Sequence, residues 1–130
     1  MRDITIIFLI LITIFVGDYA INNFLGRTTD KLIKNLASLK EHVIVANETE
    51  NRDNIKNEMG EMEESWKEIS EIWAVIVMHQ EIDNIEQALI KTKSIINDGN
   101  IEDAIPEIET AIFFVEHVKQ REKLMLKNIF

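Results

Sequence analysis

Thirteen consecutive residues near the amino terminus, from Ile4 to Val16, carry no charge and are almost all large and apolar. As an α-helix they would extend about 20 Å, which is shorter than a bilayer hydrocarbon core of roughly 30 Å. If the helix continues to Leu25 it reaches about twenty-two residues, which is long enough to cross, with Asp18 toward the far interface. The segment therefore predicts a membrane anchor over residues 1–25 that contacts lipid through Ile4 to Val16.

Two other interpretations of this segment stay open. Its length also suits the apolar part of a cleaved signal peptide, although no pair of small residues at the spacing of a cleavage site lies between Val16 and Ala20. A buried core helix would show the same run of apolar residues. Of the three interpretations we favour the anchor, and we predict that it crosses the cell membrane once.

The orientation of this anchor depends on a nearly balanced distribution of charge. Arg2 favours a cytoplasmic amino terminus, whereas Arg27, Lys31 and Lys34 favour the opposite arrangement. Because a short charged head before an apolar run is the usual layout of an export signal, we expect the rest of the chain to be extracytoplasmic.

Residues 26–130 are predicted to form one acidic domain. The whole chain has a net charge of -9 and no cysteine, so disulfides and thiolate chemistry are excluded. Nucleic acid is not an expected partner, because phosphate contacts need a basic face. Few glycines, one proline and abundant Glu, Lys and Ile indicate helices throughout.

Apolar residues in this domain recur at alternating spacings of three and four, as on one face of a helix. The pattern predicts successive helices separated by a polar turn at residues 47–54, a break or kink around His79 to Glu81, and a stop at Gly99. Thr28 to Asp30 can cap the first of these helices, and Asn100 with Asp103 can form a capping box for the last. We expect the last helix to pack against more than one neighbour, because its apolar face is wide.

The fold class that follows is all-α. We predict an N-terminal transmembrane helix followed by an antiparallel bundle of three or four helices, arranged as two helical hairpins. The apolar carboxyl end, which holds Leu124, Leu126, Ile129 and Phe130, is expected to dock on the bundle or to bind a partner.

No catalytic or cofactor motif stands out in the sequence. The densest group of metal-ligand residue types lies at His79, Glu81 and Asp83, with Glu86 beyond them. Three residues before each histidine the chain has Leu39, Ile76 and Phe114, so the Glu-x-x-His pairs of a bundle metal centre are absent. We therefore expect no metal and no cofactor, and interpret His79, Glu81 and Asp83 as a polar hinge.

A second candidate site is a seam of apolar residues that holds both tryptophans. It comprises Met59, Met62, Trp66 and Trp73 at helical spacing. Such a seam can form a groove for a partner helix or an apolar ligand. The alternative, which we favour, is that these side chains are ordinary core residues.

Several of these features together are similar to a known family. The short anchor, the Trp66 and Trp73 pair, the string from His79 to Glu86 and the closing Asn-Ile-Phe resemble the domain of unknown function 4363 family. The resemblance covers essentially the whole chain and implies a short membrane-anchored helical protein of spore-forming Gram-positive bacteria. Gln80 stands where the family usually has Ser. The family has no established activity, so no catalytic residue is carried over.

We predict a non-enzymatic adaptor or accessory module that presents its bundle at the membrane surface to a protein partner or to a copy of itself. The first alternative is a sensor that holds an apolar ligand or a partner helix on the Trp-Met seam. The second is a bundle metalloprotein built on His79, Glu81, Asp83 and Glu86.

Overall fold

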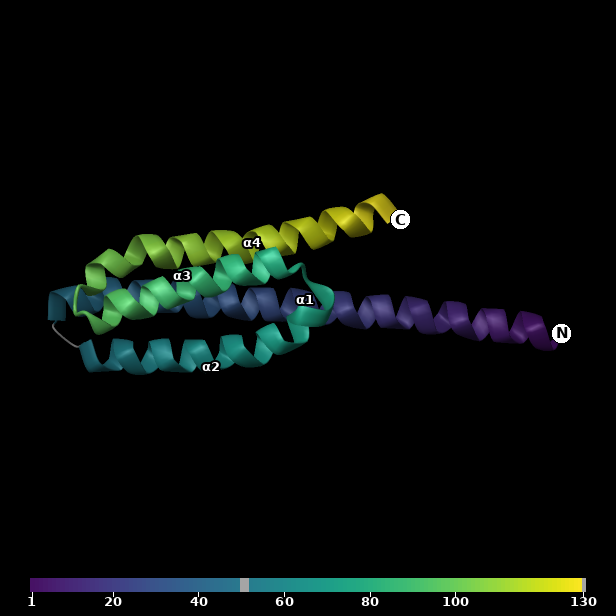
Figure 1. Ribbon diagram of the computed structural model, residues 1–130, viewed down its shortest axis with the longest axis horizontal. Helices are drawn as coiled ribbons and strands as arrows, with labels where there is room; N and C mark the ends of the chain where they lie inside the picture. Colours follow the sequence, from purple (N-terminus) through teal and green to yellow (C-terminus); the bar gives the residue numbers. More distant parts are fainter. Residues whose placement is uncertain (50–51, 130) are drawn as a thin grey trace.

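The chain folds into four helices and one short 3-10 turn in a computed structural model, which describes the backbone of residues 1–49 and 52–129 and the side chains of 1–46 and 52–123 (Figure 1). The elements are α1 (Arg2–Thr49), α2 (Arg52–Ile76), α3 (His79–Asn97), η1 (Ile101–Asp103) and α4 (Ala104–Ile129). Within these ranges there is no strand, which confirms the all-α prediction. Most side chains of the predicted polar turn at residues 47–54, and all those of the carboxyl-terminal tail from Leu124 onward, lie outside the described residues.

Helix α1 runs without interruption from the apolar segment into the bundle. The predicted helix start at Thr28 to Asp30 is therefore wrong. The Thr28 hydroxyl donates to the carbonyl of Phe24 at 3.0 Å and the Thr29 hydroxyl to that of Gly26 at 3.0 Å. Because the preceding turns are helical and already hold the backbone N–H groups, the hydroxyls bond back to carbonyls instead of capping. The predicted domain division at Leu25 lies inside this helix, and Leu25 itself is buried.

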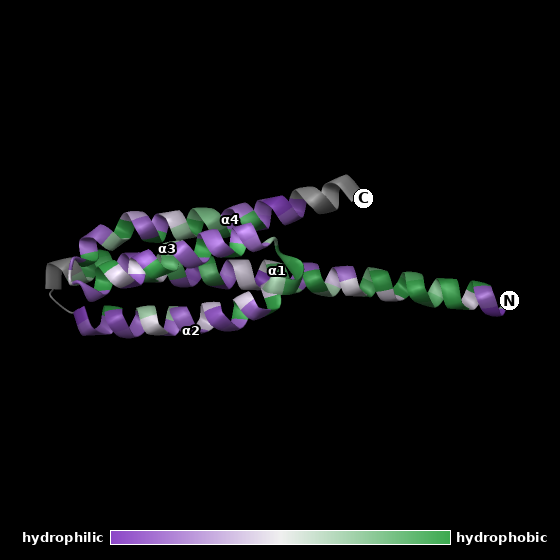
Figure 2. Cartoon of the chain, viewed as in Figure 1, coloured by the Kyte–Doolittle hydropathy of each residue, from purple (hydrophilic) through white to green (hydrophobic). Residues whose placement is uncertain are grey.

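The apolar segment projects from the bundle and is exposed along its whole length (Figure 2). Its most apolar stretch buries no residue inside the molecule, which argues against a core helix. Among the described residues, α1 is the one helix long and apolar enough to cross a membrane, by length and composition. Such a surface is costly to expose to water.

The bundle core is built from one seam on each helix, as the spacing of apolar residues predicts. Helices α2 and α4 each pack against both α1 and α3, so successive helices are antiparallel neighbours in a ring (Figure 1). The wide face of α4 therefore meets two partners, as predicted. Apolar side chains buried to 1% exposure or less come from all four helices: Leu32, Leu36, Leu39, Val43, Trp73, Ile85, Ile96, Ala104, Ile108, Ala111, Val115 and Val118.

The turns between helices follow the predicted break points with small shifts. Helix α2 ends at Ile76 and α3 begins at His79, so the break lies just before the predicted hinge. Gly99 has φ of 91°, the left-handed conformation expected of a helix stop. The predicted capping box is wrong: Asn100 precedes η1 and makes no side-chain cap bond. A 3-10 turn begins the last helix because Pro106 lacks the backbone N–H that regular helical bonding would use.

Two glycines give opposite predictions for stability. An alanine Cβ at Gly60, inside α2, would meet no atom within 4 Å. Gly60→Ala should therefore raise the free energy of unfolding by about 0.5–1 kcal/mol, since glycine is the poorer helix former. Gly99→Ala should lower it by at least about 1 kcal/mol, because φ of 91° strains any side chain. Chemical denaturation of the detergent-solubilised chain measures both, and two changes of the same sign would contradict the assignment.

Candidate functional site at the base of the bundle

Among the described side chains, three of the four buried polar ones, Thr28, Thr29 and Glu81, lie at the end of the bundle where α1 leaves it, and we call this end the junction; the fourth, Thr92, lies farther along α3. The turn between α2 and α3 lies beside α1 here, and the carboxyl end of α4 points in the same direction as the apolar segment (Figure 1). Because helices run alternately up and down, the junction brings together the middle of α1, the start of α3 and the end of α4. It is the part of the molecule nearest to the exposed apolar segment.

The predicted polar hinge lies at the junction, but its three residues do not act together. His79 and Asp83 are exposed in the first turns of α3, whereas Glu81 is only 7% exposed. Glu81 precedes Ile85 by four residues, and therefore lies on the same helix face as the buried seam of α3. A buried carboxylate needs partners, because its desolvation is costly.

Helix α4 supplies both partners of Glu81. The Nδ1 atom of His117 lies 3.1 Å from its Oε1 atom, and the Arg121 guanidinium donates to the same oxygen at 3.1 Å. His117 and Arg121 are one turn apart, so a single face of α4 presents both groups. The cluster fixes the start of α3 against the end of α4. Both partners are about half exposed, and water therefore reaches the cluster from outside.

Glu122 adds a second acidic group next to this cluster. Partial burial raises the pKa of its carboxyl above the ordinary value of 4.5, and the nearby Glu81 raises it further, while Arg121 lowers it. The Arg121 guanidinium is paired with Glu81 and only partly offsets the effects that raise the pKa of Glu122. This arrangement disfavours ionisation of Glu122 in the folded protein.

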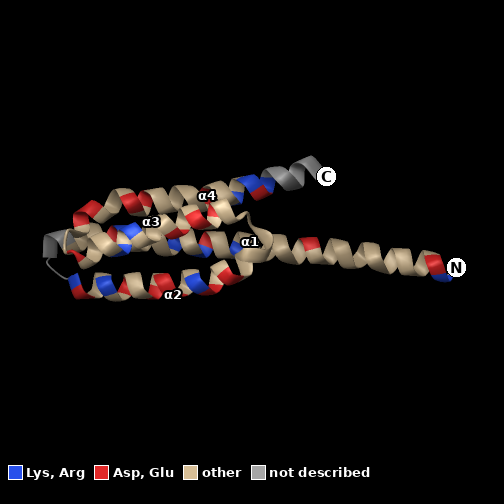
Figure 3. Ribbon diagram, viewed as in Figure 1, with Lys and Arg blue, Asp and Glu red and all other residues tan. Residues whose placement is uncertain are grey.

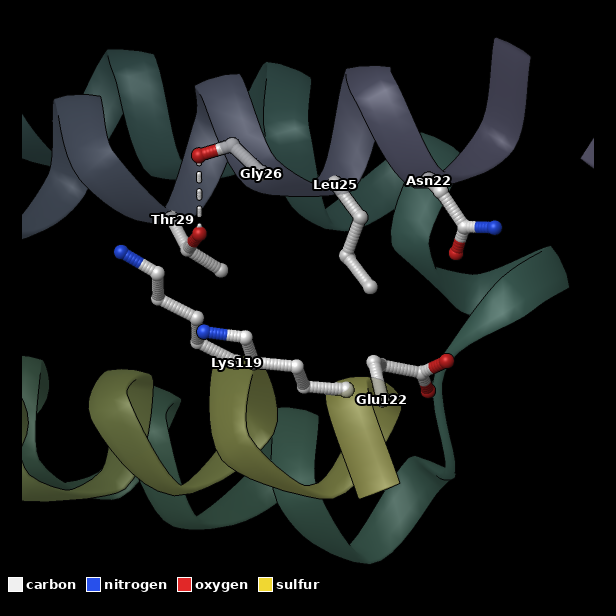
Figure 4. A pocket seen from close by; sticks show the side chains of 7 residues that line it. Asn22, Leu25, Gly26, Thr29, Lys119 and Glu122 are labelled. Carbon is white, nitrogen blue, oxygen red and sulfur yellow. Dashed lines mark hydrogen bonds between the residues drawn. The ribbon is translucent and has the colours of Figure 1, made fainter. Parts of the chain in front are cut away.

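A small pocket opens between α1 and α4 beside Glu122 (Figure 4). Its volume is about 160 Å³, below the roughly 300 Å³ at which sites for drug-sized ligands begin. Its lining includes Leu25 and Thr29 of α1 and Lys119 of α4, and Figure 4 shows these side chains reaching into the space between the two helices. The Lys119 ammonium also donates to Asp30 at 2.6 Å, which ties α4 to α1.

Trp73 closes the junction from the side of α2. It is fully buried, and its indole N–H donates to the Thr28 hydroxyl at 3.0 Å. The Thr28 hydroxyl in turn donates to carbonyls one turn back in α1. The polar atom of this large side chain is therefore satisfied within the bundle.

The predicted Trp-Met seam is part of the core. Met59, Met62, Trp66 and Trp73 are all at most 4% exposed, and the two indole rings meet edge to face at 5.7 Å between centroids. A cavity of about 60 Å³ lies beside Trp66 between α2 and α3, which is room for little more than solvent. The buried indole N–H of Trp66 has no hydrogen-bond partner among the described residues.

The polar contacts at the junction are ion pairs and hydrogen bonds between neighbouring helices. Across the described side chains, no three His, Asp or Glu residues are grouped as ligands for a metal ion. Glu86, the fourth residue of the proposed ligand group, is exposed and lines the cavity beside Trp66 instead. The arrangement can hold helices together and respond to protonation.

Glu122→Gln should raise the melting temperature slightly at neutral pH, because it removes a negative charge that partial burial and Glu81 destabilise in the folded protein. The pKa of Glu122 is higher in the folded chain than in the unfolded chain, so protonation of this carboxyl stabilises the wild-type fold as the pH falls toward 4.5. Below pH 4.5 the carboxyl is protonated in both states, and its contribution to stability no longer changes. The difference between variant and wild type should therefore shrink over that interval. Thermal unfolding across pH checks this, with the exposed Glu116→Gln as the matched control; a constant difference would contradict it.

Sequence reasoning identified Glu81 but missed His117, Arg121 and Glu122. One signal was available: Glu81 continues the seam of Ile85 and Ile96 backward, which places an acidic residue on a buried face. The sequence around Glu81 does not indicate which helix supplies its partner, because Arg121 lies 40 residues away in the chain.

One family matches this chain. Residues 19–129 match the family model described as Domain of unknown function (DUF4363). This range begins within α1 and extends to the end of α4, so it covers the whole bundle and the junction. No curated protein and no solved structure matches the chain.

Proposed function

The chain belongs to the DUF4363 family, and from that premise we propose that it is a membrane-anchored, non-enzymatic adaptor. Residues Ile4 to Val16 lie in the bilayer, and the bundle is presented at its surface to a protein partner or to a second copy. This placement makes the protein single-pass in the cell membrane. An extracytoplasmic bundle is the orientation we propose, and reporter fusions after Leu25 and at Phe130 would test it.

The continuity of α1 is the observation that carries this proposal. A single helix of 48 residues contains both the exposed apolar segment and one quarter of the bundle. Because an α-helix is stiff over this length, the bundle is held at a fixed height and direction relative to the segment. A flexible linker would suit a protein that searches for distant substrates, whereas a rigid support suits one that positions a binding surface.

The polar groups at the junction support a structural role rather than a catalytic one. Glu81 is paired with His117 and Arg121, and Lys119 with Asp30. These pairs join neighbouring helices to each other. A catalytic group would instead face a pocket of substrate size.

Two large apolar side chains on the bundle surface are available to a partner. Ile90 of α3 and Phe113 of α4 are each 62% exposed, although most of the described apolar residues of these helices are buried. Exposed aromatic and aliphatic side chains are the usual anchors of protein interfaces. We propose Ile90 and Phe113 as contact residues for the partner.

Photo-crosslinking in native membranes tests the adaptor role. A photoreactive amino acid at position 90 or 113 should give a discrete crosslinked product, identified by mass spectrometry as one protein or as a second copy. The same group at Lys56, on the exposed face of α2, is the control. Phe113→Glu should remove the product without changing the melting temperature. A chain that stays monomeric and uncrosslinked at both positions would overturn the proposal.

One observation favours a second candidate, a sensor that holds an apolar ligand on the Trp-Met seam. The buried Trp66 N–H is unpartnered within the described part of the chain, and it lies beside a cavity. Ligand entry would require α2 and α3 to separate, because the present cavity is small. Tryptophan fluorescence that does not respond to a panel of lipids and metabolites would remove this candidate.

A further inference from the structure

We propose that the junction docks onto the surface of an anionic bilayer, with the α2–α3 turn in the interface and a ring of basic side chains on the lipid headgroups. This inference rests on the proposed anchoring, and goes beyond it by assigning a second lipid contact outside the apolar segment. Two separate groups of residues support it.

The α2–α3 turn is the first group. Between Glu71 and Glu81 the chain has no Asp, Glu, Lys or Arg. Val75 is 85% exposed, Met78 54% and Ile72 51%, so the tip of the turn presents large apolar side chains to the outside. The turn lies beside α1 at the point where that helix leaves the bundle (Figure 1). An apolar patch in this place meets the bilayer that holds the anchor.

The second group is a basic collar on the junction ends of α1 and α4, made of Arg27, Lys31, Lys34, Lys119, Arg121 and Lys123. Residues 27–34 and 116–123 hold these six basic residues and three acidic ones, and Arg121 also pairs with Glu81 of α3, whereas the whole chain has a net charge of -9. Figure 3 shows the contrast along α4, whose first turns are acidic and whose described end is basic. All six collar residues are exposed.

A groove between α1 and α4 gives the collar a shape that suits a headgroup. Its volume is about 480 Å³, and Lys34, Lys119 and Lys123 line it together with Ile33. Asp30 and Glu116 also line it, and Asp30 accepts a hydrogen bond from Lys119. Three ammonium groups around one groove attract a phosphate, while the apolar wall accommodates the glycerol end of a lipid.

The distance of the collar from the hydrocarbon core, measured along α1, agrees with a contact to lipid headgroups. If the helix crosses the hydrocarbon core between Ile4 and Leu25, then Lys31 lies about 9 Å beyond the core at 1.5 Å per residue. The headgroup layer is roughly 5–7 Å thick on each side, and a lysine side chain reaches back across the remaining distance. The contact is available to the leaflet on whichever side the bundle lies.

The natural absence of cysteine makes a direct test practical. The full chain, with a single fluorescent label at Val75→Cys, is reconstituted into phosphatidylcholine vesicles with and without phosphatidylglycerol, and quenching by a nitroxide-labelled lipid is measured. We expect strong quenching at position 75 in vesicles with phosphatidylglycerol. A label at Ile44→Cys, at the opposite end of the bundle, should not be quenched. A label at Ile12→Cys should be quenched in every vesicle, because it reports the anchor itself.

Charge variants test the collar. K31Q/K34Q/K123Q should reduce the docked fraction at position 75 in phosphatidylglycerol vesicles, since each lysine near an anionic surface contributes about a five-fold factor in binding. K56Q/K91Q/K93Q removes three charges from the rest of the bundle and should leave it unchanged. If position 12 is quenched but position 75 is not, docking is overturned while anchoring stands. If position 12 is not quenched, anchoring itself is overturned. Equal quenching at 75 with both triple variants would overturn the role of the collar.

Discussion

Leu11→Lys combined with Ile14→Lys should move the protein from the membrane pellet to the soluble fraction. A lysine near the centre of a transmembrane helix costs about 2.5–3.5 kcal/mol, so the two together cost roughly 5–7 kcal/mol. Both side chains are exposed on the part of α1 outside the bundle, and the bundle should therefore fold as before. Fractionation after an alkaline carbonate wash measures the change.

The matched control places the same charges on the bundle surface. Ile44→Lys with Ile90→Lys replaces two exposed apolar side chains and should leave the protein in the membrane pellet. Retention of the Leu11 and Ile14 variant in the pellet would show that another contact holds the protein there. The intact mass of the native protein separates an anchor from a cleaved signal, because only an anchor retains residues 4–16.

Trp73→Ala should lower the free energy of unfolding by about 3–5 kcal/mol, the largest effect that we expect of a single core substitution. The side chain is fully buried where α2 meets the junction, and the surrounding helices cannot close the space it leaves. The loss also removes the hydrogen bond to Thr28. Chemical denaturation of the solubilised chain provides the measurement.

Two further variants divide the effect of Trp73 into its parts. Trp73→Phe keeps most of the apolar volume but loses the N–H donor, and should cost less than Trp73→Ala, about 1–3 kcal/mol. Ile72→Ala changes the neighbouring exposed residue and should stay within about 0.5 kcal/mol. A cost below about 1 kcal/mol for Trp73→Ala would mean that the tryptophan does not support the core as described.

Most of the bundle could be predicted from the sequence because its apolar spacing is regular. The apolar spacing predicts a seam from Ile55 to Ile76, which is buried from Ile55 to Trp73 and partly buried at Ile76. The break before His79 follows from the change in apolar spacing after Ile76. The prediction of a helix start at Thr28 failed because a capping pattern is local. Whether Thr28 caps depends on whether the residues before it are already helical.

The junction could be predicted only in part, because it depends on long-range pairing. Glu81 was predicted only as part of a polar hinge with His79 and Asp83, and its partners come from α4, although either neighbouring helix could have supplied them. The exposure of the α2–α3 turn also could not be predicted from the sequence. Val75 and Trp73 are both apolar, and only the packing of the helices decides that one is 85% exposed and the other fully buried.

One unbroken helix, α1, connects the exposed apolar segment to the bundle. This continuity can be tested by measuring the distance between spin labels at Asp18→Cys and Ala37→Cys in the reconstituted full chain, by pulsed electron resonance. Both positions are exposed on α1, on opposite sides of the predicted division at Leu25. A continuous helix predicts one narrow distribution near 28 Å, from 1.5 Å per residue. A broad distribution, or a mean well below this value, would show a hinge and contradict the account.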